Sequence, residues 1–436
     1  MSLTSHTTGR VFCRRGFLRV GSCGLLGIGL ADALRAESVS RPDVPRATSV
    51  ILLWLGGGPS TIDMWDPKPD ADAEVRGEFD TMATAVPGER FSEHMQQTAR
   101  ILDRCTLVRS LHHNIPDHVP GSQYVMTGNK PSANAEHPSI GSLTANLLPT
   151  SAGMPAYFSL GEASSSGAGF LGAQFDPFRI NLPQPPATVS LDGVILPADL
   201  TAAQLHRRHQ LRRVFDSQFT TTHPHSDLVA TLTDFQHQAF DILSSNRIGR
   251  AFDLASEPEP IKELYGESPI GRSAMIARRL IEAGARFVTI ATNDWDTHAN
   301  NFTTLRQLLP PLDRALAGLI VDLQQRGMLA ETIVMCGGEF GRTPIVNRTA
   351  GRDHWSRAMT YLLAGGGFHS GLVYGATDER GFDPVLGACS PDELAATILS
   401  QLGFPPGHKV HTTSGRPIAM FENGTVIQDI VAGRPS

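Results

Sequence analysis

The chain has 436 residues, which is enough for one large α/β domain or two ordinary ones. Apolar residues make up 41% of it and charged residues 18%, so a packed globular protein is expected and a disordered one is not. The formal net charge of −6 argues against a nucleic-acid binder, because such proteins usually carry a basic face.

The first forty residues have the pattern of an export signal. Arg14 and Arg15 precede a Phe-Leu pair, an apolar stretch over residues 20–34 follows, and Ala36 ends a cleavage site. The paired arginines resemble the twin-arginine signal, which carries folded proteins across the membrane. A transmembrane anchor is the alternative, but the stretch is shorter than the ~20 apolar residues that a span needs.

We therefore predict a twin-arginine signal peptide over residues 1–36 and a polar spacer over residues 37–48. The mature protein is expected in the periplasm or outside the cell, exported by the twin-arginine machinery and without a membrane span. Two of the five cysteines fall in the signal. Neither a disulfide framework nor a zinc–thiolate site is expected from the others, which are Cys105, Cys336 and Cys389.

Short apolar runs predict strands that are buried in a parallel sheet. The first run covers residues 50–55 and is closed by three glycines, and further strands are expected at 105–109, 286–291, 332–336 and 360–364. Helices are expected at about 271–283, 309–325 and 392–402. This alternation predicts the α/β class, with a doubly wound, mostly parallel sheet and helices on both faces.

The middle of the chain has a different composition. Residues 150–200 are rich in Gly, Ser, Pro and Ala, which predicts long loops with short strands near Val189 and Val194. Residues 201–257 have a helical pattern. We expect one domain over residues 49–430, with an insertion at about 150–257 that covers the carboxyl edge of the sheet.

Polar clusters follow the apolar runs, at the sheet edge where such folds place their sites. Asp63 closes the first cluster and can reach a metal ion or cap the next helix. Asp296 and His298 lie together in the second, at a spacing that suits a Zn, Mn or Ca-type site. In the third, Glu339 stands beside Arg342, which can clamp the oxygens of a phosphate or sulfate or only pair with the glutamate.

Two more clusters add histidines. His354 lies in the fourth, at residues 351–355, and the fifth, at residues 112–118, holds His112, His113 and His118. We expect some of the latter to hold loop backbone only. Acidic, imidazole and guanidinium groups at successive strand ends favour a metal-assisted hydrolase over a plain binding module.

These clusters, in this order, resemble the family of secreted bacterial proteins known as domain of unknown function 1501 (DUF1501). The resemblance covers nearly the whole mature chain. The motifs that carry it are the twin-arginine start, the Gly-Gly-Pro-Ser loop, and residues 65–69, 75–79, 176–178, 295–298, 338–344 and 351–355.

The chain is also distantly similar to the alkaline phosphatase and sulfatase superfamily. That resemblance implies metal-ligand positions for Asp63, Asp296, His298 and His354, and it places Glu339 at the carboxylate of an Asp-His-Gly motif that has lost its imidazole here.

The nucleophile position departs from that pattern. His118 stands where sulfatases carry a Cys or Ser, and Ser122 stands where they carry an Arg. The usual sulfate-ester chemistry is therefore not expected, and His118 is a nucleophile, a metal ligand or a general base.

The leading hypothesis is an exported, metal-dependent hydrolase of an anionic ester, either sulfate or phosphate, with a divalent Zn, Ca or Mn ion. His118 would act at the reacting centre and Arg342 would steady the anion. The expected ligands are Asp63, Asp296, His298, Glu339 and His354. The alternative is a non-catalytic relative that binds a sulfated or phosphorylated glycan or a partner protein.

Overall fold

The computed structural model describes residues 45–151, 153–182, 200–201, 203–208, 210–212 and 239–432. The predicted signal peptide, most of the predicted spacer and the strands expected near Val189 and Val194 lie outside these residues. No helix among the described residues is long and apolar enough to cross a membrane.

An eight-stranded sheet forms the centre of the fold, in the order β12-β4-β11-β8-β1-β7-β5-β6. Paired strands run parallel except at β11, which is antiparallel to both of its neighbours. All five predicted strands are present. The strands are β1 (Ser49–Leu55), β4 (Cys105–Leu111), β5 (Tyr157–Leu160), β6 (Phe178–Ile180), β7 (Phe287–Thr292), β8 (Thr332–Gly337), β11 (Met359–Ala364) and β12 (Leu372–Tyr374).

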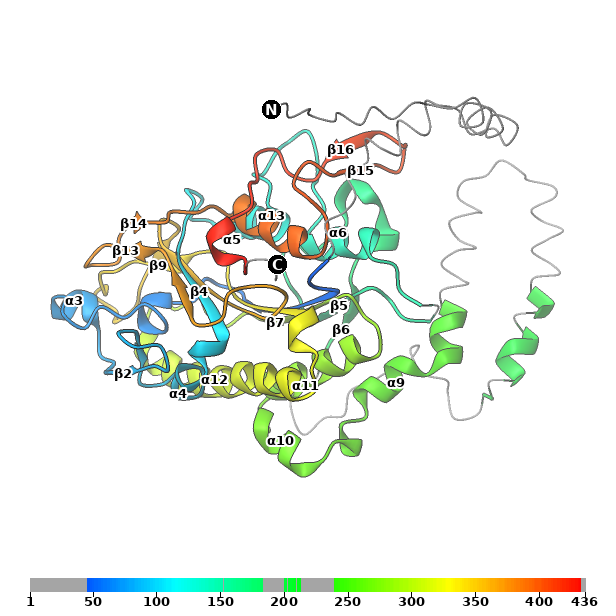
Figure 1. Ribbon diagram of the computed structural model, residues 1–436, viewed down its shortest axis with the longest axis horizontal. Helices are drawn as coiled ribbons and strands as arrows, with labels where there is room; N and C mark the ends of the chain where they lie inside the picture. Colours follow the sequence, from blue (N-terminus) through cyan, green and yellow to red (C-terminus); the bar gives the residue numbers. More distant parts are fainter. Residues whose placement is uncertain are drawn as a thin grey trace, which may run out of the picture. The chain divides into compact units, whose positions relative to one another are not determined.

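Helices cover both faces of this sheet (Figure 1). Because side chains alternate along a strand, Leu53 of β1 packs into one apolar core while Leu52 packs into the other. The first core includes α4 (Gln96–Arg100), α11 (Pro269–Glu282) and α12 (Asn301–Gln325). The second includes α5 (His118–Thr127), α6 (Ile140–Leu147) and α13 (Pro391–Gln401). The predicted α/β class, with helices on both faces, is confirmed.

Helix α12 begins eight residues earlier than the sequence analysis placed it, at Asn301 instead of 309. Phe302, Leu305 and Leu309 are buried at helical spacing, which is the signal that the many polar neighbours obscured. This extension matters for the site, because it places Asn301 directly behind the loop after β7.

Part of the predicted insertion belongs to the sheet itself. Strands β5 and β6 extend the sheet beyond β7, in a region where long loops were expected. Each is so short, at four and three residues, that the surrounding Gly, Ser and Pro hide its pattern. Further along, α9 (Arg247–Phe252) and α10 (Glu259–Tyr265) pack against α11 and α12.

The described fold also includes small two-stranded sheets and a short helix. The ladder of β9 (Gly341–Arg342) with β10 (His354–Trp355) lies at the candidate site. The others are α3 (Ala73–Arg76), β2 (Thr81–Ala83), β3 (Arg90–Ser92), β13 (Ala376–Thr377), β14 (Pro384–Leu386), β15 (Lys409–His411) and β16 (Pro417–Ala419).

Candidate metal centre

Three loops leave the same edge of the sheet because β1 is parallel to both β7 and β8. The register pairs Leu55 with Thr292 and Trp54 with Gly337, so the loops that follow start at one level. Gly57 has a φ of 112°, and a Cβ there would lie 2.6 Å from the backbone nitrogen of Asp296. The glycine loop therefore permits a close approach that a larger residue would block.

Three predicted site residues converge above this edge. One ligand atom each from His118, Asp296 and His354 lie within 4.8 Å of one another, and together they could hold a metal ion. The Nε2 atom of His118 lies 3.3 Å from Oδ2 of Asp296, and that of His354 lies 3.2 Å from Oδ1. His298 joins them, with its Nε2 atom 3.0 Å from Oδ1 of Asp296.

The three imidazole rings share one orientation, with Nδ1 turned outward and Nε2 turned toward Asp296. Nδ1–H of His298 donates to Asp353 (2.7 Å), and Nδ1–H of His354 donates to the carbonyl of Pro116 (2.7 Å). Nδ1–H of His118 donates to Oε1 of Glu339 (2.7 Å). Each outward hydrogen bond fixes the ring tautomer, as carboxylates and carbonyls do for metal-bound histidines.

Where these rings carry a single proton, the inward-facing Nε2 atoms have lone pairs. A carbonyl can only accept, so the Nδ1 of His354 carries a proton. The ionised carboxylate of Asp353 also only accepts, so the Nδ1 of His298 carries a proton as well. The hydrogen bond from His298 lowers the pKa of Asp353, which keeps that carboxylate charged. The Nε2 atoms of His298 and His354 are nevertheless only 3.0 Å apart.

Asp296 stays ionised at this point. Burial works against its charge, but the hydrogen bond and the charge of Arg342 outweigh burial and hold the pKa of Asp296 at about 2. Nη2 of Arg342 donates to Oδ1 of Asp296 at 2.5 Å. A charged carboxylate among three inward nitrogens is the donor set of a cation site.

Arg342 supports the loops and does not reach solvent. Its side chain is 0% exposed. Besides Asp296, it donates to the backbone carbonyls of Gly57, Gly58, Trp295 and Arg352. The expected role of Arg342 as a clamp on a substrate anion therefore has no support in this geometry, because the guanidinium is enclosed.

Glu339 lies behind His118 instead of among the inward donors. Its Oε1 accepts from the backbone N–H of Gly57 (2.9 Å) and from His118, while its buried Oε2 has no hydrogen-bond partner. The adjacent Phe340 packs its ring 5.1 Å from that of His118 and 4.5 Å from that of His354. Together these two residues set the orientation of the imidazoles.

Asp63 is not among the converging residues. It forms a buried, bidentate ion pair with Arg352, at 2.8 Å for both contacts, and also accepts from Ser60 and Asn301. Three protein donors face Oδ2 of this buried carboxylate and one faces Oδ1. Asp63 therefore supports the site from behind. It joins the glycine loop after β1 to Arg352, the residue before Asp353.

The loop that carries Asp353 and His354 is fixed by close backbone packing. His354 pairs with Arg342 in the β9–β10 ladder. A Cβ at Gly351 would lie 2.0 Å from the carbonyl of His298, so only glycine fits there. The side chains of the four converging residues are 21–46% exposed, which leaves the centre accessible from solvent.

His113 is one of the histidines that hold loop backbone. Burial lowers the pKa of His113, so its ring is neutral. Nε2–H donates to the carbonyl of Glu339 (2.7 Å), and Nδ1 accepts from the N–H of Ile115 (3.1 Å). This links the residues 112–117 to the loop after β8.

The family profile described as "Protein of unknown function (DUF1501)" matches residues 47–431. The chain belongs to the DUF1501 family. No protein with curated annotation matches this DUF1501 chain.

Solved structures with a similar arrangement include three bacterial proteins. The lipoteichoic acid synthase LtaP from Listeria monocytogenes is 10% identical, with a TM-score of 0.38 over 90% of this chain and 79% of that one. The PsFucS1 sulfatase from Pseudoalteromonas sp. is 12% identical, with a TM-score of 0.36 over 85% and 70%. The alkaline phosphatase from the Antarctic bacterium TAB5 is 13% identical, with a TM-score of 0.33 over 83% and 99%.

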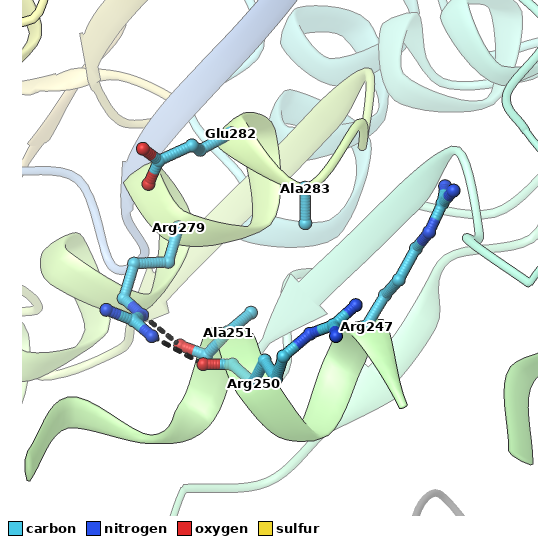
Figure 2. A pocket seen from close by; sticks show the side chains of 6 residues that line it. All are labelled: Arg247, Arg250, Ala251, Arg279, Glu282 and Ala283. Carbon is cyan, nitrogen blue, oxygen red and sulfur yellow. Dashed lines mark hydrogen bonds between the residues drawn. The ribbon is translucent and has the colours of Figure 1, made fainter. Parts of the chain in front are cut away.

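A separate hollow of this DUF1501 chain, about 270 Å³ in volume, is lined by arginines of α9 and α11 (Figure 2). Arg279 turns its guanidinium onto the carbonyls of Ala251 (2.9 Å) and Arg250 (2.5 Å). Its hydrogen bonds fasten α9 to α11. Glu282 is the one carboxylate among the lining residues, and no histidine lines the hollow. The hollow therefore lacks the metal-binding side chains that converge at the sheet edge.

Proposed function

We propose that this DUF1501 protein is an exported, metal-dependent hydrolase of an anionic ester. The observation that carries the proposal is the convergence of three Nε2 atoms on one ionised carboxylate. Lone pairs that face one another at 3.0 Å repel unless a cation lies between them. A shared proton could bridge His298 and His354, whereas a metal ion would also engage His118 and Asp296, and so all four donors from three segments of the chain.

The donor set fits a divalent transition metal. Four ligands on a tetrahedral Zn²⁺ at about 2.0–2.1 Å are roughly 3.3 Å from one another. Each of the three Nε2 atoms lies 3.0–3.3 Å from an oxygen of Asp296, and those of His298 and His354 are 3.0 Å apart, whereas the ligand atoms of His118, Asp296 and His354 lie within 4.8 Å of one another. Three imidazoles and one carboxylate suit Zn²⁺ or Mn²⁺, whereas Ca²⁺ prefers a full shell of oxygens.

A divalent ion held here would polarise an ester oxygen and lower the pKa of water. The chain's own residues supply the rest of the site. Glu339 and Asp353 fix the tautomers of His118 and His298, and Arg342 keeps Asp296 ionised. Because Nε2 of His118 points at Asp296, this geometry favours the ligand role for His118 over the nucleophile role.

Two observations support the alternative, a binding protein without turnover. Arg342, the cation predicted to bind the substrate anion, is buried, and the converging side chains include no hydroxyl or thiol. A protein of this kind would bind an anionic ester at the metal centre and release no product.

Hydrolysis of chromogenic esters separates the two. Metal-loaded mature protein is mixed with 4-nitrophenyl phosphate, bis(4-nitrophenyl) phosphate or 4-nitrophenyl sulfate, with and without a chelator. We expect 4-nitrophenol release that stops on chelation, returns with added metal, and is lost in His354→Ala but kept in His411→Ala, a matched change at an exposed histidine of β15. Tight ester binding without release would favour the alternative.

Export is supported by the amino-terminal pattern alone. A fusion of residues 1–48 to a reporter that is active only in the periplasm tests it in cells. We expect reporter activity from the natural sequence and none after Arg14→Lys with Arg15→Lys, because the twin-arginine machinery reads the pair. Equal activity from both would contradict this route.

A further inference from the structure

An anionic substrate needs cations that the metal centre itself does not offer. Arg342, the arginine that pairs with Asp296, is enclosed and also donates to backbone carbonyls. A positively charged side chain that binds the rest of the substrate must therefore lie elsewhere on the accessible surface.

A cavity of about 860 Å³ supplies such groups. It is formed where the segment after β4, helix α5 and the segments near β10 and β14 meet. Its polar lining includes His112, Asn114, Tyr124, Lys130, Arg357 and Asp383.

Lys130 is the cation of this cavity with no anionic partner. Within the part of the chain that the structure describes, its ammonium forms no ion pair, and it lies 6.0 Å from the centroid of the Tyr124 ring. Arg357 pairs with Asp383 at 2.6 Å, but their side chains are 59% and 41% exposed. Exposed pairs of this kind are weak, so Arg357 can turn to another oxyanion.

None of the four converging residues lines the cavity, but residues of the cavity contact the segments that carry them. His113 lines the cavity and donates to the carbonyl of Glu339, whose carboxylate holds His118. On the other side, Arg357 follows His354 by three residues, and the carbonyl of Ser356 accepts from the N–H of His113. A ligand in the cavity therefore lies against the same two segments that position the metal ligands.

We infer that this cavity is a subsite for a second oxyanion, sulfate, phosphate or carboxylate, on the non-reacting part of the substrate, and that Lys130 and Arg357 bind it. The inference rests on the proposed function, since it takes the first oxyanion to be the ester at the metal centre. It defines the substrate class as esters with at least two anionic groups, such as a multiply sulfated or phosphorylated glycan.

Calorimetric titration with two probes tests the subsite. A heparin-derived tetrasaccharide carries several oxyanions, whereas 4-nitrophenyl phosphate carries one. We expect Lys130→Ala to weaken tetrasaccharide binding about tenfold, the size of one charge-assisted contact, and to leave 4-nitrophenyl phosphate binding unchanged. Lys130→Arg should restore affinity, and the matched change Lys409→Ala, at an exposed lysine of β15, should have no effect.

Unchanged tetrasaccharide affinity in Lys130→Ala, or an equal loss in Lys409→Ala, would overturn the subsite. The titration is repeated in His354→Ala, which removes a metal ligand and leaves the cavity lining intact. Lys130-dependent binding that persists there supports the subsite even if the wild-type protein holds no metal. The proposed hydrolase is tested separately, by metal content and by product release. Failure of the hydrolase proposal can therefore be distinguished from failure of the subsite.

Discussion

The Nε2 atoms of His298 and His354 lie 3.0 Å apart, although each ring already donates its Nδ1–H to a separate acceptor. Two neutral imidazoles in this arrangement would repel each other. The metal ion that we propose, placed in the space that they share with Asp296, would remove this repulsion. Because three separate segments supply the two rings and their partners, the tertiary structure itself fixes this contact.

The carboxylate behind His298 is expected to tune metal affinity. Asp353→Asn keeps the size of the side chain but removes the charge that orients the ring, so affinity should fall about 10–100-fold without loss of folding. Competition with a fluorescent chelator measures this. The matched control is Asp383→Asn, at another exposed, paired aspartate; a similar loss there would show that the effect is general electrostatics and not the His298 contact.

Asp63 is expected to matter for stability and not for metal stoichiometry. Asp63→Asn leaves the buried guanidinium of Arg352 without its counter-charge, which should cost about 3–5 kcal/mol of the free energy of unfolding. Denaturant unfolding and elemental analysis of the folded variant check both parts. Glu78→Gln, in an exposed pair with Arg306, should cost at most about 1 kcal/mol. Loss of metal from folded Asp63→Asn protein would instead return Asp63 to the ligand set.

The three cysteines of the described fold are expected to be unreactive. Burial raises the pKa of Cys105 and of Cys389 to about 12, and burial also raises the pKa of Cys336. The thiolate is the reactive form, so at pH 8 nearly all of these thiols stay protonated and unreactive, and reactivity would rise only at strongly alkaline pH. Ellman's reagent should detect no thiol in native mature protein and three in denaturant; a fast reaction of one thiol would contradict this burial.

The sheet and the outline of the site could be predicted from the sequence because both depend on local patterns. Apolar runs such as residues 50–55 predict buried strands, and polar residues placed after them predict groups at one sheet edge. His118, Asp296, His298 and His354 were found in this way, and the structure places them together.

The roles of the supporting residues could not be predicted, because they depend on long-range contacts. Asp63 and Arg352 are 289 positions apart, and no local pattern indicates that they pair. Arg342 follows a strand end as an anion-binding arginine would, and only the folded loops show that it is enclosed. Asp353 directly precedes the expected ligand His354, so its place in the motif at residues 351–355 indicated that it lies near the site. Its partner His298 lies 55 positions away, and the sequence did not indicate that the two pair.

Metal content tests the central claim most directly. Mature protein from metal-replete medium is exchanged into buffer without free metal and subjected to elemental analysis beside the Asp296→Ala, His298→Ala double variant, with unfolding curves to confirm that both are folded. We predict about one tightly bound Zn²⁺ or Mn²⁺ per wild-type chain and almost none in the variant. A folded wild-type protein without stoichiometric metal, or a variant that keeps its metal, would contradict the account.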